Sequence, residues 1–179
     1  MNETPRLPNG ALRPGITDCG DLNLRIGRDG TWFYHGSPIP RKEMVCLFAS
    51  ALVRADDGGY WLITPGEAGR IEVEDAPFLA VELFRNGSGR EQVISFRTNV
   101  DEMVTLDQDH PLRVTIDPAS GEPSPYILVR DGLEARLGRA VYYELVAHGL
   151  EEKVGMEVLY GIWSRGTFFP MGKADGAAD

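Results

Sequence analysis

Two segments of the chain repeat the same order of local patterns, and this repetition constrains the fold more than any single motif does. Residues 22–26 alternate apolar and polar side chains, the tripeptide Arg-Asp-Gly follows at 28–30, and an aromatic segment comes next. The same tripeptide recurs at 130–132 between two further apolar segments. Asp-Gly supplies the positive φ that a tight hairpin turn needs. Each tripeptide therefore predicts a β-hairpin.

One helical segment follows each predicted hairpin. Apolar residues recur at helical spacing across residues 44–52, and a second helix is predicted over 140–148, with Gly149 suited to a left-handed C-terminal cap. A further hairpin follows each helix, with an aromatic second arm at 60–61 and at 168–169. The sequence therefore predicts an α+β fold of two similar β-rich lobes with one helix each, by internal duplication. The alternative is two unrelated stretches built from the same common elements.

The same patterns predict the domain boundaries. Prolines and polar residues dominate residues 1–20, which predicts an irregular N-terminal arm. The first lobe is expected over residues 21–84 and the second over residues 85–172, with a flexible tail at 173–179.

Composition excludes several classes of function. The 179 residues carry a formal net charge of −9, which disfavours binding to the phosphate backbone of nucleic acids. No apolar segment reaches the ~18 residues of a membrane helix, and residues 1–15 lack the apolar region of a signal peptide. Cys19 and Cys46 are too few for a disulfide framework or a zinc site. We therefore expect a cytoplasmic protein with no cofactor and no nucleic-acid or membrane partner.

The sequence lacks several common enzyme signatures. It has no G-x-S-x-G elbow, phosphate-binding Walker loop, H-E-x-x-H or EF-hand loop. His35 and His148 lack an evident nucleophile partner, and the acidic stretch before His110 predicts a solvated turn rather than a metal site. The Gly-Ser-Gly sequence at 87–89 predicts a hairpin loop rather than an anion cradle. No catalytic or metal-binding residue is predicted.

Arginines stand at both predicted helix starts, where acidic side chains are normally preferred. Arg41 precedes the first helix and Arg139 begins the second, although a helix N-terminus carries partial positive charge. Helix-start N–H groups together with an arginine can bind an anion. The competing interpretation is a structural salt bridge from Arg41 to Glu43, Glu67 or Asp75.

Polar and aromatic residues near Arg41 complete the predicted ligand site. The aromatic strand at 60–63 leads into a Thr-Pro turn, so Thr64, Glu67 and Asp75 are predicted to line a polar mouth. Tyr34 and Tyr60 would supply stacking surface. Ordinary turn chemistry and core packing are the alternative for this stretch.

Several short stretches, in this order, resemble one bacterial family. They are DGTWFY at 29–34, GSPIPR at 36–41, LF at 47–48, GY at 59–60, TP at 64–65, Glu67 and VEDAPF at 73–78. The chain resembles the family catalogued as domain of unknown function 1285, from about residue 22 to residue 172. The resemblance implies two similar lobes, the second loosely like a pleckstrin-homology domain. It also implies a suggested role in signal transduction, with no established activity and no catalytic residues.

These observations lead to three functional hypotheses. We expect a non-enzymatic binding or regulatory module that takes a small anionic ligand or a peptide in a cleft between the lobes, with Arg41 and Arg139 supplying charge. The first alternative is a homo-oligomeric scaffold, such as a homodimer formed through an exposed strand or aromatic patch. The second is a hydrolase that uses Glu67 and Asp75 as a carboxylate pair, which requires the two acids to lie about 5–10 Å apart.

Overall fold

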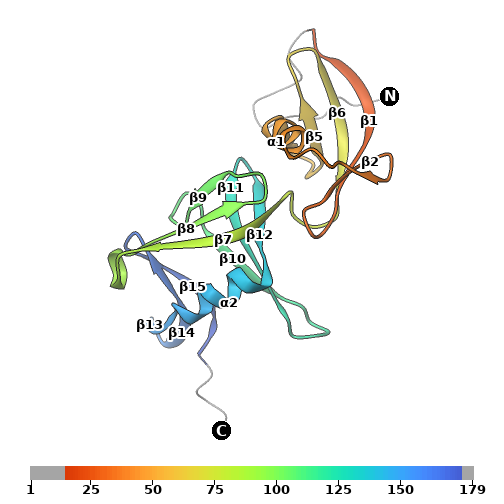
Figure 1. The fold of residues 1–179 in the computed structure, drawn as a ribbon. Coiled ribbons are helices and arrows are strands. Elements are labelled where there is room, and N and C mark those ends of the chain that lie inside the picture. Colours follow the sequence, from red (N-terminus) through yellow and green to blue (C-terminus); the bar gives the residue numbers. More distant parts are fainter. Residues whose placement is uncertain (1–14, 175–179) are drawn as a thin grey trace. The chain divides into compact units, whose positions relative to one another are not determined.

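The computed structural model describes residues 15–174, which fall into two compact units. The first unit comprises the described residues up to Phe78 together with Arg130–Leu133, and the second comprises the rest. Each unit is rich in β-strands and contains one α-helix (Figure 1). The predicted pair of similar β-rich lobes is therefore confirmed. No helix among the described residues is long and apolar enough to cross a membrane.

The first unit is built from one six-stranded sheet and helix α1. Its elements are β1 (Thr17–Ile26), β2 (Trp32–Tyr34), β3 (Ser37–Pro38), α1 (Lys42–Ser50), β4 (Leu52–Arg54), β5 (Tyr60–Ile63) and β6 (Glu67–Val73). The strand order is β3-β2-β1-β6-β5-β4. All neighbours pair antiparallel except β1 and β6, which run parallel. This parallel pair joins the N-terminal hairpin to the meander that follows the helix.

Large apolar side chains form the core of the first unit. Ile26, Trp32, Leu52 and Phe78 are almost fully buried. Trp32 also stacks on Phe48 of α1, with the ring centroids 6.2 Å apart. Ile26 of β1 and Trp32 of β2 are cross-strand partners, so their side chains lie on the same face of the sheet.

The second unit contains a six-stranded sheet, a three-stranded sheet and helix α2. Its elements are β7 (Phe78–Asn86), the 3₁₀ helix η1 (Gly89–Glu91), β8 (Val93–Thr98), β9 (Met103–Thr105), β10 (Leu112–Ile116), β11 (Pro123–Arg130), β12 (Leu133–Leu137), α2 (Arg139–Ala147), β13 (Leu150–Val154), β14 (Glu157–Ser164) and β15 (Thr167–Lys173). The sheet orders are β10-β11-β12-β7-β8-β9 and β13-β14-β15. The hydroxyl of Tyr160 in β14 donates to the carbonyl of Val146 in α2 at 2.5 Å.

The order of elements repeats between the two ends of the described chain. A hairpin with an Arg-Asp-Gly turn, a helix and a three-stranded antiparallel meander occur once as β1 to β6 and again as β11 to β15. The predicted match between the aromatic arms is wrong, because residues 60–61 lie in the middle strand of one meander and residues 168–169 in the last strand of the other. The sequence pattern did not predict β13. Because β13 is the first strand of the second meander, the aromatic residues 168–169 fall in its third strand. The likeness to a pleckstrin-homology domain stays a prediction.

The compact units divide the chain at a different point from the predicted lobes. The division lies after Phe78, at the start of β7, whereas the predicted boundary lay at 84–85. β1 begins at Thr17, within the stretch predicted as an irregular arm. Residues 1–14 of that arm and residues 175–179 of the predicted tail lie outside the described residues.

Candidate functional site

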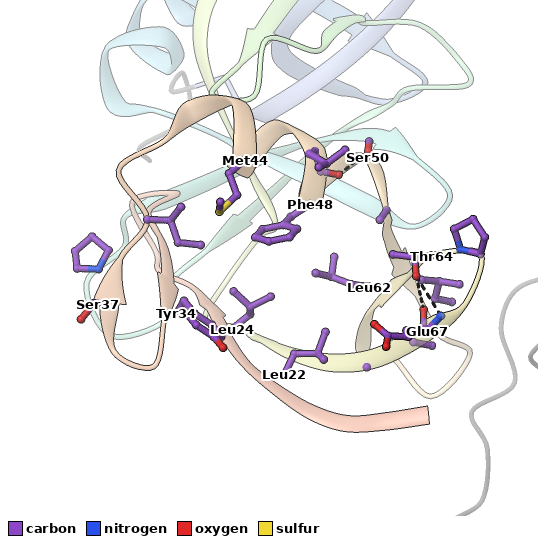
Figure 2. A pocket seen from close by; sticks show the side chains of 18 of the residues that line it. Leu22, Leu24, Tyr34, Ser37, Met44, Phe48, Ser50, Leu62, Thr64 and Glu67 are labelled. Atoms are coloured by element: carbon purple, nitrogen blue, oxygen red, sulfur yellow. Dashed lines mark hydrogen bonds between the residues drawn. The ribbon is translucent and has the colours of Figure 1, made fainter. Parts of the chain in front are cut away.

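The first unit contains an open pocket of about 970 Å³ between α1 and the sheet (Figure 2). Most of its lining side chains are apolar. The lining residues are Leu22, Leu24, Tyr34, Ser37, Pro38, Ile39, Pro40, Met44, Leu47, Phe48, Ser50, Ala51, Leu62, Ile63, Thr64, Pro65, Glu67, Ala68 and Gly69.

The apolar face of α1 forms one wall of the pocket. Met44, Leu47, Phe48 and Ala51 lie at helical spacing, which places them on one side of the helix. The sequence predicts this face as core. However, Leu47 remains 67% exposed and Met44 remains 40% exposed. The helix therefore presents apolar surface that the described residues leave uncovered.

Strands β1, β5 and β6 form the opposite wall. Leu22 and Leu24 of β1 and Leu62 of β5 point into the cavity in Figure 2. Gly69 of β6 leaves room for the side chain of Leu22, because a Cβ at position 69 would collide with that side chain. A larger residue at position 69 would force Leu22 to move.

Polar groups lie at two separate ends of this apolar cavity. The turn from β5 to β6 places Thr64 and Glu67 at one end, and Tyr34 and Ser37 lie at the other (Figure 2). The Thr64 amide donates to the Glu67 carbonyl at 2.8 Å, and the Glu67 amide donates to the Thr64 hydroxyl at 3.1 Å. These bonds fix the backbone of the turn.

The structure brings together three of the seven predicted ligand residues. Tyr34, Thr64 and Glu67 line the pocket. The sequence suggested Thr64 and Glu67 for a polar mouth and Tyr34 for stacking surface. The apolar wall that accompanies them was not predicted as part of a site. Its only sequence signal was a helical face that carries a methionine and a leucine near a turn rich in proline.

The other four predicted residues do not line this pocket. Arg41 is the exposed N-cap residue of α1, and its side chain makes no ion pair with another described residue. Asp75 follows the end of β6. In the second unit, Arg139 lies 3.8 Å from the carboxylate of Glu122, and both side chains are largely exposed.

Tyr60 has a structural partner in Arg54. Its hydroxyl accepts a hydrogen bond from Nη1 of Arg54 at 2.9 Å, and the Arg54 guanidinium lies 4.9 Å from the ring centroid. Together these contacts occupy the ring that was predicted as stacking surface.

The predicted carboxylate pair is separated by the length of a strand. Glu67 begins β6, and Asp75 comes after its last residue, Val73. Seven extended residues span about 20 Å. This separation exceeds the spacing that a glycosidase-like carboxylate pair requires, so the geometry does not support the hydrolase hypothesis.

Arg130, from the second tripeptide, has a role that the sequence did not reveal. Its guanidinium donates to the carbonyl of Ala49 at 2.7 Å and to that of Leu52 at 3.3 Å, and it lies 5.4 Å from the ring of Phe78. The carbonyls at a helix C-terminus have no intrahelical partner and favour cations. Arg130 therefore stabilises the end of α1.

The clear pKa shifts among the described residues fall outside the pocket. Hydrogen bonds from Thr31 hold the pKa of Asp29 below its usual value. Burial raises the pKa of Tyr142. No group of three or more potential metal ligands is found among residues 15–174.

Comparison with known proteins identifies the family. Residues 14–76 match the model described as "Domain of unknown function (DUF1285), N-terminal domain", and residues 77–171 match "Protein of unknown function (DUF1285), C-terminal domain". The chain belongs to the DUF1285 family. The two DUF1285 models meet close to the division between the compact units. The search of curated proteins found no match.

Two solved DUF1285 structures are similar to this chain. One is a family protein from Silicibacter pomeroyi, with 42% identity, a TM-score of 0.81, and coverage of 89% of this chain and 85% of that one. The other is from Shewanella baltica, with 31% identity, a TM-score of 0.56, and coverage of 71% of this chain and 92% of that one. Both confirm the resemblance noted from the sequence.

Proposed function

We propose that this protein is a non-enzymatic binding module whose first unit takes a small amphipathic molecule in the pocket beside α1. One observation carries the proposal: an open cavity of about 970 Å³ whose walls are apolar, with polar groups at its ends. Pockets for small molecules typically measure about 300–1,000 Å³ and combine apolar walls with a few polar groups.

The energetics favour a ligand with an apolar body. Met44 and Leu47 expose apolar surface on α1, and removing such surface from water gains about 25 cal/mol per Å². A ligand lying along the helix would cover both side chains and the ring edge of Phe48. Its polar groups would meet the ends of the cavity, where Thr64 and Glu67 lie.

This proposal keeps the predicted class of function but changes the expected ligand. No lysine or arginine is found among the described residues that line the pocket, so these residues offer no side-chain cation to a small anion. The predicted anion or peptide site between the lobes stays a prediction. A regulatory role in signal transduction would follow if occupancy of the pocket changed what the protein binds.

Uptake of a neutral dye tests the pocket. The dye N-phenyl-1-naphthylamine fluoresces strongly in apolar surroundings, and we expect saturable uptake by the wild type. Ala51→Phe fills the cavity from the end of α1 and is expected to weaken uptake at least about fivefold, as a steric block of an apolar site should. Ala147→Phe, at an exposed position of α2 that does not line the pocket, is the matched control.

The proposal fails if the wild type takes up no dye, or if Ala51→Phe binds as tightly as the wild type. Thermal melting of both variants shows that each is folded. If both variants lose uptake equally, the dye binds elsewhere and the proposal fails as well.

The homo-oligomeric scaffold remains the second candidate, and one surface favours it. The β13–β14 hairpin exposes Leu150, Val154, Met156 and Val158, and Met156 is 100% exposed. β13 is also an edge strand of its sheet. Exposed apolar side chains at a sheet edge are typical of strand-pairing surfaces, and light scattering would detect the dimer.

A further inference from the structure

We infer that the ligand of this pocket carries a positively charged amine at the end marked by Glu67. The inference rests on the proposed function and adds the chemical class of the ligand. Among the described residues that line the cavity, Glu67 is the only one with a charged side chain. A ligand that fills the apolar part would therefore meet one formal charge, and that charge is negative.

The Glu67 side chain is not used by the fold within the described residues. The backbone of Glu67 is held by Thr64, whose hydroxyl donates to the Glu67 carbonyl at 3.1 Å and accepts from its amide at 3.1 Å. No hydrogen bond or ion pair joins the Glu67 carboxylate to another residue between 15 and 174. Figure 2 shows this carboxylate on the cavity side of the turn.

Filling the pocket changes the surroundings of this carboxylate. An apolar ligand would displace water from one side of Glu67, and removing water from a charged group is unfavourable unless a partner replaces it. A carboxylate or phosphate on the ligand would add repulsion at the same place. An amine would donate charge-assisted hydrogen bonds to the Glu67 oxygens and offset the loss of water.

The opposite end of the cavity does not reverse this preference. Tyr34 and Ser37, which lie there, are neutral side chains that can donate or accept hydrogen bonds. Arg41 and Lys42 begin α1 but do not line the cavity. Among ligands of equal length, the charge of Glu67 therefore determines which head group is preferred.

Competition among three ligands of identical chain length tests the sign of the charge. Decylamine, decan-1-ol and decanoate are added as competitors for N-phenyl-1-naphthylamine at neutral pH, each below its aggregation concentration. Glu67 is exposed, so its ion pair should be modest. We expect decylamine to compete about fivefold better than decanol, and decanoate to compete more weakly than decanol.

Two neutralising variants separate a local effect from the acidity of the whole protein. Glu67→Gln should reduce the preference for decylamine over decanol to within about twofold. Glu72→Gln, at an exposed position of the same strand that does not line the pocket, removes the same charge and should leave the preference unchanged.

The outcomes distinguish this inference from the proposed function. Equal competition by the three ligands, or a preference that survives Glu67→Gln, overturns the amine assignment while dye uptake still supports the pocket. An equal loss of preference in both variants overturns it too, because the general acidity of the protein would then explain the result. A wild type that takes up no dye refutes the proposed function itself.

Discussion

Replacing Gly69 by alanine tests how closely β1 and β6 approach each other beside the pocket. A Cβ on Gly69 would lie 2.5 and 2.9 Å from the two methyl carbons of Leu22 and closer still to its Cγ. Because Cγ is the branch point of the side chain, a small rotation cannot relieve the collision. Overpacking of this kind costs about 1–3 kcal/mol. Alanine regains about 0.4–1 kcal/mol by restricting the unfolded chain, which leaves a net loss of about 1–2 kcal/mol.

A double-mutant cycle with Leu22→Ala isolates this contact. Leu22 is half-buried, so Leu22→Ala alone should cost about 1–2 kcal/mol, less than the loss of a fully buried leucine. In that background the clashing atoms are gone, and Gly69→Ala should be neutral or slightly stabilising. The coupling energy between the two positions should therefore reach about 2 kcal/mol.

Urea unfolding followed by tryptophan fluorescence measures the cycle. Trp32 and Trp61 are both buried in the first unit, and a Trp163→Phe background removes the reporter in the second unit. Equal destabilisation by Gly69→Ala with Leu22 present and absent would refute the close approach of the two strands.

Two further predictions concern Arg130 and Asp107. Arg130→Met should lower the free energy of unfolding in urea by about 1–3 kcal/mol, because the guanidinium donates to the Ala49 carbonyl at the end of α1. The control, Arg28→Met in the other tripeptide, should lower it by less than about 0.5 kcal/mol. Similar losses in the two variants would contradict the capping role of Arg130. Burial alone would raise the pKa of Asp107, but hydrogen bonds from His110 outweigh it and hold the pKa below its usual value. This stabilisation is present above about pH 4 and is lost as pH falls through the folded-state pKa of Asp107. The loss in free energy of unfolding caused by Asp107→Asn should therefore shrink in acid. A loss that stays constant from pH 7 to about pH 2 would refute this prediction.

The repeated order of elements could be predicted because its signals are local. Asp-Gly at each tripeptide predicts a turn, and the structure places Gly30 and Gly132 at positive φ. The helical periodicity before residue 52 likewise predicts α1 within two residues of its observed ends. Turn chemistry and periodicity belong to short stretches of chain, so they are readable without tertiary contacts.

Strand β13 could not be predicted in this way. Its sequence, LEEKV, carries three consecutive charged residues and lacks strict alternation of apolar and polar side chains. An edge strand with little buried surface needs no such alternation, and charges are common on exposed edges. Pairing with β14 gives this segment its conformation, and that pairing is a tertiary property.

Gly149 shows how a correct residue can be predicted for the wrong reason. The sequence suggests a left-handed cap, but Gly149 is not among the glycines at positive φ. A Cβ there would lie 2.7 Å from the ring of Tyr160 and 2.9 Å from the carbonyl oxygen of Gly161. Close packing of β14 therefore requires glycine at this position, and this requirement is invisible to helix-capping rules.

The candidate site likewise contains residues that the sequence could predict and residues that it could not. Thr64 and Glu67 could be proposed from the turn that holds them, since turn chemistry is local. The apolar wall could not, because Met44 and Leu47 have the spacing of an ordinary core face. Only the fold shows that these side chains stay exposed beside a cavity.

The fold uses many of the arginines of this chain in contacts with aromatic rings. Fifteen of the 18 basic residues are arginine. Six arginines in the described part of the chain lie over aromatic rings: Arg25 over Phe33, Arg54 over Tyr60, Arg70 over Trp61, Arg90 over Trp163, Arg113 over Tyr126 and Arg130 over Phe78. Guanidinium groups stack on rings and donate several hydrogen bonds at once, which a lysine ammonium does less well. The excess of arginine over lysine therefore fits a role in packing β-rich units. Arg130, which contacts a ring and two carbonyls, would lose those contacts to bind an anion. Arg41 and Arg139, the arginines predicted for the anion site, are not among these six. In the pocket, the carboxylate of Glu67 has no hydrogen-bond or ion-pair partner among residues 15–174, so the proposed amine would bind it without breaking a contact within that part of the chain.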